Sequence, residues 1–369
     1  MKKVKLGDYI KEYTVRNKNS EDIPVYSVTN KQGFCRDYFG KEVASKDKSI
    51  YKIVPKGYFA YNPSRINVGS VDWQRNEERV IVSPLYNVFS VSDKLEQQYL
   101  YYYLKSGFAL QRINAIATGS VRDNLKLDML CEFPIRIPDI EEQRLIVEKL
   151  DTINKIIRLQ EQELKTLDDL VNARFVEMFG KCHNMATIED LCLIITDGTH
   201  NPPKFQDKGI PFIFVSNLAD NKVTYNTEKY ISEETYDEII KRTPIEKGDV
   251  LLSTVGSYGH PAIVVEDKKF LFQRHIAYMK PKHDLIDSFY LHGALLAPDG
   301  QRQIEEKVKG IAQKTLNLSE IRKIRIPVPS MDKQKEFKTF IETIAKSKLI
   351  LKNHHFERGI LSGDKFFIS

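Results

Sequence analysis

The chain has 369 residues, enough for two domains of ordinary size, and its 41% hydrophobic and 29% charged residues predict a folded, soluble protein. It has no apolar run of the roughly 18–20 residues that a membrane span needs, no signal-peptide pattern, and four scattered cysteines that form neither a disulfide framework nor a paired zinc site. We therefore expect a cytoplasmic protein without a membrane partner, and a net charge of +6 does not by itself indicate a nucleic-acid-binding protein.

The charge is distributed unevenly along the chain. Residues 1–138 carry 22 Lys and Arg against 15 Asp and Glu, whereas residues 139–180 carry 6 against 10. Residues 181–329 balance at 20 of each, and residues 330–369 carry 8 against 5. A basic first region can attract a polyanion such as DNA, although an ordinary Lys-rich surface would show the same surplus.

The first half opens with short β-like runs. Residues 23–29, 51–61 and 79–91 are bounded by Pro, Gly and Asn clusters, as strands and turns require. A helical segment is expected over 93–116. A short Leu-x-Leu element follows and ends at Pro138, which favours a new helix directly after it.

That next helix, expected over 139–178, carries two interleaved seven-residue ladders. One is complete, and the other is interrupted by Gln160 and Arg174. Residues 146–178 would span about 50 Å at ~1.5 Å per residue. Such a pattern is typical of a coiled coil, although a buried bundle helix can also carry it. The apolar ladder positions include Ile146, Leu150, Ile153, Ile157, Leu164, Leu167 and Val171.

The second half follows the same order. Its β-like runs cover 210–216, 249–255 and 270–279, and a helical segment is expected over 287–308. A last helix, over 332–361, has a rougher seam, with Lys348 and His355 at ladder positions. Its apolar ladder residues are Phe337, Ile341, Ile344 and Leu351. We expect the two long helices to pair in antiparallel fashion.

A repeat explains this correspondence. When the chain is aligned with itself at a fixed offset of 191 residues, Lys56-Gly57 aligns with Lys247-Gly248, Pro138 with Pro329 and Gln143 with Gln334. A unit of about half the chain indicates a tandem duplication and not a solenoid. We predict an α+β protein of two mixed α/β domains in pseudo-twofold arrangement, with an antiparallel coiled coil. The expected boundaries are 1–138, 139–180 (first helix), 181–329 and 330–369 (second helix).

Catalytic motifs are weak. Asn201-Pro202-Pro203 resembles the turn of amino-group DNA methyltransferases, but Lys204 stands where an aromatic residue would stack on the extruded base. No glycine-rich methyl-donor loop or ATP-binding phosphate loop occurs. Pro298-Asp299 with Glu305-Glu306-Lys307 matches a nuclease pattern only superficially, and no histidine has metal-ligand spacing. We expect no catalytic residue and no metal site.

Two non-catalytic modules and a spacer suit recognition of a two-part target. Polar loop residues can read base edges, and Lys and Arg can contact phosphates, although such residues are often merely exposed. The candidates in the first module are Asn30, Lys31, Arg65, Asn67 and Arg122. Those in the second are Thr199, His200, Lys204, Asn217, Ser257, Tyr258 and Lys314.

Taken in order, several short motifs resemble the specificity subunit of type I restriction–modification systems. They are Gly33-Phe34, Ser45-Lys46 and residues 62–70 in the first module, residues 196–200, Ile210-Pro211-Phe212 and residues 248–251 in the second, and the Gln143 and Gln334 helix starts. The resemblance covers essentially the whole chain.

The resemblance implies two target recognition domains that each read half of a split DNA sequence, and helices that fix the gap and dock partners. The implied partners are double-stranded DNA, two modification subunits and restriction subunits. S-adenosylmethionine, ATP and Mg would be bound by those partners and not by this chain. The alternatives are a fused adenine methyltransferase that uses Asn201-Pro202-Pro203 and a coiled-coil scaffold without a DNA role.

Overall fold

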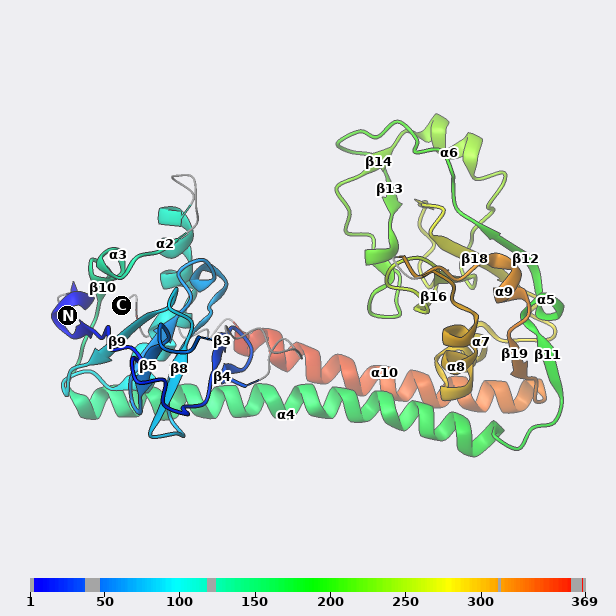
Figure 1. The fold of residues 1–369 in the computed structure, drawn as a ribbon. Coiled ribbons are helices and arrows are strands. Elements are labelled where there is room, and N and C mark those ends of the chain that lie inside the picture. The colour runs from blue at the N-terminus through cyan, green and yellow to red at the C-terminus, as the bar shows by residue number, and fades with distance from the viewer. Residues whose placement is uncertain (1–2, 37–46, 118–123, 311–312, 360–366, 368–369) are drawn as a thin grey trace. The chain divides into compact units, whose positions relative to one another are not determined.

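The computed structural model describes residues 3–36, 47–117, 124–310, 313–359 and 367 (Figure 1). The chain divides into two compact units, residues 1–160 with 353–369 and residues 161–352. The dividing point lies inside the first long helix, so each unit contains one mixed α/β domain and part of that helix.

The first unit is built on a four-stranded antiparallel sheet in the order β2-β9-β6-β7, beside three two-stranded pairs, β1-β10, β3-β4 and β5-β8. Its strands are β1 (Val4–Lys5), β2 (Ile10–Glu12), β3 (Ser27–Thr29), β4 (Gly33–Cys35), β5 (Lys52–Pro55), β6 (Phe59–Tyr61), β7 (Val71–Trp73), β8 (Arg79–Val82), β9 (Asn87–Val91) and β10 (Pro134–Ile135). Its helices are α1 (Gln97–Lys105), α2 (Gly107–Ala117), α3 (Leu127–Cys131) and the start of α4 (Ile140–Phe179), with 3-10 turns at Leu6–Asp8 and Ile66–Val68.

The second unit has a corresponding antiparallel sheet in the order β12-β18-β15-β16, a three-stranded sheet β14-β13-β17 and the pair β11-β19. Its strands are β11 (Met185–Thr187), β12 (Cys192–Asp197), β13 (Ile210–Ile213), β14 (Tyr230–Ile231), β15 (Val250–Ser253), β16 (Pro261–Ile263), β17 (Leu271–Phe272), β18 (Ile276–Pro281) and β19 (Arg325–Pro327). Its helices are α5 (Ile188–Leu191), α6 (Glu233–Ile239), α7 (Ser288–Leu296), α8 (Pro298–Lys307), α9 (Leu318–Arg322) and α10 (Met331–Gly359), with a 3-10 turn at Val215–Leu218.

The tandem repeat is confirmed at the level of the elements. The offset that places Gln143 on Gln334 also places both ends of α1 on those of α7, both ends of α3 on those of α9, and the start of α4 on that of α10. The two four-stranded sheets also have matching strand orders. The duplication therefore produces two domains of one architecture, as predicted.

Several expected elements were too long. Residues 51–61 divide at Gly57, where φ is +83°, into strands of two different sheets. The expected helix 93–116 breaks at Ser106, which has an extended ψ of 152° and whose hydroxyl accepts a hydrogen bond from the Ala109 N–H. The helix 287–308 breaks before Pro298, because proline cannot donate a helical hydrogen bond. Residues 270–279 likewise divide into two strands, β17 and β18, separated by a turn.

A buried glutamine connects each long helix to its domain. Gln334 is fully buried; its side-chain oxygen accepts from the Asp287 N–H at 2.8 Å, and its amide donates to the carbonyls of Leu285 and Pro329, both at 3.0 Å. Gln143 makes the equivalent three bonds at the start of α4. These bonds satisfy the donors and the acceptor of an amide that is itself fully buried.

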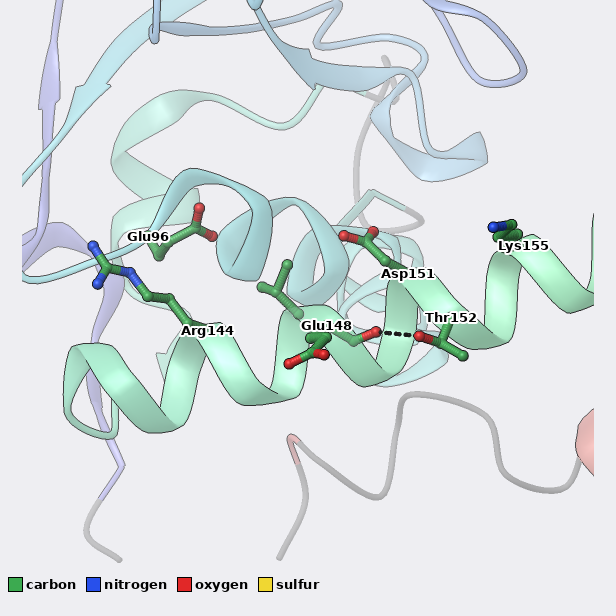
Figure 2. A pocket seen from close by; sticks show the side chains of 7 residues that line it. Glu96, Arg144, Glu148, Asp151, Thr152 and Lys155 are labelled. Carbon is green, nitrogen blue, oxygen red and sulfur yellow. Dashed lines mark hydrogen bonds between the residues drawn. The ribbon is translucent and has the colours of Figure 1, made fainter.

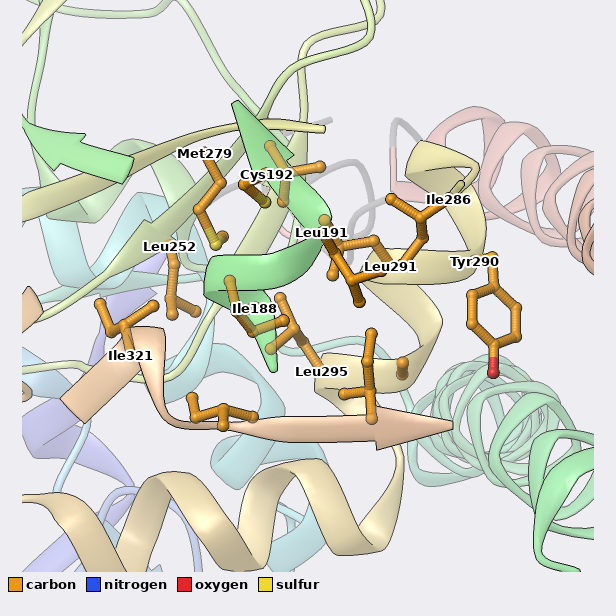
Figure 3. Close-up of a cluster of buried hydrophobic side chains, with 14 of the residues drawn as sticks. Ile188, Leu191, Cys192, Leu252, Met279, Ile286, Tyr290, Leu291, Leu295 and Ile321 are labelled. Carbon is orange, nitrogen blue, oxygen red and sulfur yellow. The ribbon is translucent and has the colours of Figure 1, made fainter. Parts of the chain in front are cut away.

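Aromatic residues complete both cores. At the end of α4, Phe175 and Phe179 pack on Tyr290 with ring centroids 5.5 and 5.0 Å away, beside the apolar cluster shown in Figure 3. In the first unit Phe367 packs on Tyr99, which corresponds to Tyr290, at 5.3 Å. Each core therefore includes an aromatic residue from a distant part of the chain.

Within the second unit, the end of α4 runs antiparallel to α10. Arg174 of α4 forms an ion pair with Glu336 of α10 at 3.4 Å. Asp168, which precedes Arg174 in α4, pairs with Lys348, which follows Glu336 in α10. The predicted antiparallel pairing is thus confirmed here, and Arg174 and Lys348, which interrupt the seam, form ion pairs.

The ladder residues divide between two roles. Ile146 and Leu150 are buried in the core of the first domain, and Phe337 in that of the second. Ile344 is also buried, while Ile153, Ile157, Leu164, Leu167, Val171, Ile341 and Leu351 are partly buried. The apolar heptad positions therefore serve two purposes: some pack into the domain cores, and others lie where the two helices pair.

Replacing Gln334 with Leu should lower the stability of the second unit. The variant keeps the side-chain volume but removes three hydrogen bonds to partly buried backbone groups, each worth about 0.5–1.5 kcal/mol. We expect a loss of roughly 2–4 kcal/mol, seen as a lower melting temperature in thermal unfolding. Lys335→Ala, at the exposed neighbouring position, is the control. Equal melting temperatures of the two variants would contradict the role of the glutamine.

Candidate nucleic-acid interface

One edge of the sheet in the second domain gathers polar loops. Because β12 and β15 both run antiparallel to β18, their carboxyl ends lie at the edge where β18 begins. A hollow of about 300 Å³ opens there. It is lined by Asp197, Thr254, Val255, Arg274, His275, Gln313, Thr315, Leu316, Asn317 and Leu318.

Gly198 allows two loops to meet at this edge. A Cβ atom at this position would lie 2.2 Å from the carbonyl oxygen of Phe272 and 2.4 Å from that of Gln273. The Thr199 N–H donates to the Phe272 carbonyl, and the Arg274 N–H donates back to the Thr199 carbonyl, both at 3.2 Å. Glycine is therefore required sterically, for close approach of two backbones.

The predicted Thr199 and His200 lie on this loop. The imidazole of exposed His200 lies 2.9 Å from one carboxylate oxygen of Asp197, and Arg242 pairs with the other at 3.0 Å. The Thr199 hydroxyl donates to the Asn201 carbonyl at 3.0 Å. Asn201 and Lys204 are exposed, and the Asn-Pro-Pro turn lies outside every strand.

Tyr258 and Lys314, which are far apart in sequence, lie together. Both donate hydrogen bonds to Glu305, Lys314 at 3.1 Å, and the Lys314 ammonium lies 5.6 Å from the Tyr258 ring centre. Hydrogen bonds from Tyr258 and Lys314 lower the pKa of Glu305. The exposed Ser257 precedes Tyr258, and the Gly256 N–H donates to the Lys314 carbonyl at 3.3 Å. The structure therefore brings the predicted residues 199–200, 257–258 and 314 to one edge of the domain.

The structure adds Arg274 and His275, which sequence reasoning missed. Both lie in the turn between β17 and β18, inside the run that was expected to form one strand. The sequence signal for this turn was the polar Arg-His pair between two apolar runs. Because residues 270–279 were expected to form one continuous strand, no turn was predicted there.

The first domain repeats the meeting of loops. The Leu125 N–H donates a hydrogen bond to the Pro63 carbonyl. Leu316 is the residue that corresponds to Leu125 in the second repeat, and its N–H donates to the Thr254 carbonyl in the same way. The Ser64 hydroxyl donates to the Asn124 side chain at 2.7 Å. Arg65 is exposed and Asn67 half-buried on the same loop, whereas Arg122 lies outside the described residues.

Lys105 connects Asn30 with this loop. Its ammonium donates to the backbone and side-chain oxygens of Asn30, at 2.9 and 3.1 Å, and to the Gly69 carbonyl. Burial lowers the pKa of Lys105. Lys31 is exposed next to Asn30. The predicted residues at 30–31 and 65–67 therefore belong to connected loops.

Asn217 was predicted to contact DNA, but the structure places its side chain in the interior of the domain. It is buried; its side-chain oxygen accepts from the Phe214 N–H at 3.0 Å, and its amide donates to Thr224 and to the Asn226 carbonyl. Because these bonds use both ends of the amide, we assign Asn217 to loop folding and leave it out of the interface.

The described residues contain no group of three or more His, Cys, Asp and Glu that could hold a metal ion. None of the helices in the described ranges has the length and apolar character of a membrane span.

Both halves of the chain match one family of known proteins. The family model of the type I restriction modification DNA specificity domain matches residues 2–169 and 183–357. The chain is 25% identical over 329 residues to the type I restriction enzyme EcoBI specificity subunit of Escherichia coli, covering 79% of this chain and 68% of that protein. A specificity subunit of Methanocaldococcus jannaschii, MjaVIII, is 25% identical over 77 residues, or 21% of this chain and 18% of that protein.

Solved structures share the fold. A chain from work on complex assembly and conformational transition of the type I R-M system has a TM-score of 0.60 and 18% identity, covering 98% of this chain and 95% of that one. The type I restriction-modification S subunit from M. genitalium has a TM-score of 0.50 and 14% identity, over 100% and 96% of the two chains.

Gly198→Ala should displace the turn that carries Arg274. The added methyl group has no room between the two carbonyl oxygens, so the loops must separate at a cost of roughly 1–3 kcal/mol. Thermal unfolding should show a lower melting temperature than for Ser216→Ala, an exposed control. A variant as stable as the control would show that the loops do not need this close approach.

Proposed function

We propose that this chain, which belongs to the family of type I restriction–modification DNA specificity proteins, reads a bipartite double-stranded DNA target with one recognition domain per half. The family is non-catalytic and supplies DNA sequence specificity. The observation that carries the proposal is the repeated sheet edge, where a corresponding backbone hydrogen bond joins two polar loops in both domains, from Leu125 to Pro63 and from Leu316 to Thr254.

The chemistry of these loops suits DNA. Exposed cations such as Lys31, Arg65 and Lys204 can contact phosphates, while amide and hydroxyl groups can bond to base edges in the major groove. In the first domain the proposed readers are Asn30, Lys31, Arg65, Asn67 and Arg122. In the second they are Thr199, His200, Lys204, Ser257, Tyr258 and Lys314.

The long helices would fix the gap between half-sites. Helix α4 is continuous over 40 residues, about 60 Å at ~1.5 Å per residue. Half-sites one DNA turn apart have centres roughly 34–36 Å from each other, which such a helix can span. We propose residues 139–180 and 330–369 as the spacer between recognition domains 1–138 and 181–329.

The partners would be two modification subunits and the restriction subunits, which would bind S-adenosylmethionine, ATP and Mg. The first part of α4 offers a docking surface. Leu145 and Leu159 are 49% and 55% exposed on one side of the helix. Beside them lies a charged hollow of about 330 Å³ lined by Glu96, Arg144, Glu148, Asp151, Thr152 and Lys155 (Figure 2), together with Val147. Exposed leucines next to mixed charges suit a protein partner better than DNA.

Exchange of the first domain tests the DNA-reading function. Residues 1–138 are replaced by the corresponding domain of a relative, and methylated adenines are mapped across the genome with the modification subunits present. We expect a split motif in which only one half changes, because each domain reads its own half-site. An unchanged motif would support a scaffold without a DNA role, and tight methyl-donor binding by the isolated chain would support a methyltransferase.

The docking surface has its own test. Leu145→Glu combined with Leu159→Glu should weaken binding to the modification subunits about tenfold or more, because a carboxylate would be buried in an apolar contact. Co-purification and titration of the full chain measure the effect. Val265→Glu, at a loop residue 52% exposed, is the control. Equal affinity of both variants would place the docking surface elsewhere.

A further inference from the structure

The turn that carries Arg274 is held by its neighbours on both sides. Its N–H donates to the Thr199 carbonyl at 3.2 Å, and the His275 carbonyl accepts from the Thr254 N–H at 2.9 Å. The Ile276 N–H closes the turn on the Gln273 carbonyl at 3.1 Å. Arg274 therefore projects from a backbone that is fixed between the ends of β12 and β15, which suits a group that must be positioned accurately.

The guanidinium is oriented by the residue that follows it. The Arg274 Nε–H donates to Nε2 of half-buried His275 at 3.3 Å. Burial, and then the nearby guanidinium, lowers the pKa of His275, so the imidazole is neutral at neutral pH and able to accept this bond. With Nε engaged, the two Nη groups remain as a pair of parallel donors.

Two other cations at this edge are already paired with carboxylates. Arg242 is bound to Asp197, and Lys314 to Glu305. Arg274 is exposed and, within the described ranges, forms no salt bridge. It lines the hollow together with the exposed amides of Gln313 and Asn317.

We propose that Arg274 contacts a guanine in the half-site of the second domain, with His275 as its positioning residue. This assignment rests on the proposed DNA-reading function. Guanine presents two acceptors, O6 and N7, in the major groove, and they match a pair of parallel N–H donors. The fixed turn and the neighbouring amides favour a base edge over a phosphate, which a flexible cation contacts equally well.

Arg274→Lys tests the assignment, because it keeps the charge and removes the paired donors. The full chain, assembled with its modification subunits, is assayed on DNA carrying each base at each position of both half-sites. We expect discrimination at one G·C pair of the second half to fall roughly 5- to 100-fold, with the first half unchanged. The matched control is Arg302→Lys, on the exposed side of α8.

The role of His275 has a separate readout. His275→Gln keeps an acceptor for Nε and should retain discrimination at that G·C pair, whereas His275→Phe should lose it without a change at other positions. Equal discrimination by both variants would show that His275 does not position Arg274.

The remaining outcomes are distinct. A uniform loss over all sequences in Arg274→Gln, with a smaller salt dependence of binding and no loss in Arg274→Lys, would identify a phosphate contact and overturn the guanine assignment. Unchanged discrimination would overturn it as well. A wild-type chain that directs no split motif would refute the proposed function itself, and the assignment with it.

Discussion

The arrangement of each domain on its helix depends on one buried glutamine. Gln143 and Gln334 each stand in the first turn of a long helix and bond to three backbone groups of the segments before the helix. Because a buried amide must satisfy its donors and acceptor together, its geometry leaves little freedom to the helix start. This contact links the direction of the helix to the position of α1 or α7.

The same constraint separates the shared architecture of the repeat from its variable surface. Next to the glutamine, helices and strands correspond between the two repeats, and Tyr99 and Tyr290 both donate to a backbone carbonyl near the last strand of their domain. At the far sheet edge the residue types differ. A frame that keeps two loop pairs in register can therefore present different polar groups without a change of fold.

The ion pairs at the sheet edge of the second domain agree with the equal numbers of basic and acidic residues in that part of the sequence. Asp197 and Glu305 neutralise Arg242 and Lys314, so a DNA-facing surface here would depend on a few oriented donors more than on surplus charge. The first domain, with its basic surplus, can supply more non-specific attraction. The modest total charge is thus compatible with DNA recognition by both domains.

The sequence by itself determined the duplication, the two long helices and the order of elements, because periodicity, proline positions and a fixed offset are local properties of the chain. It also located loops that include Thr199, Tyr258 and Lys314. Only the tertiary structure showed that these loops meet, that Asn217 is buried, and that the run 270–279 contains the turn with Arg274. Those facts depend on contacts between residues distant in sequence, where strand pairing, steric room at Gly198 and buried hydrogen bonds decide the outcome.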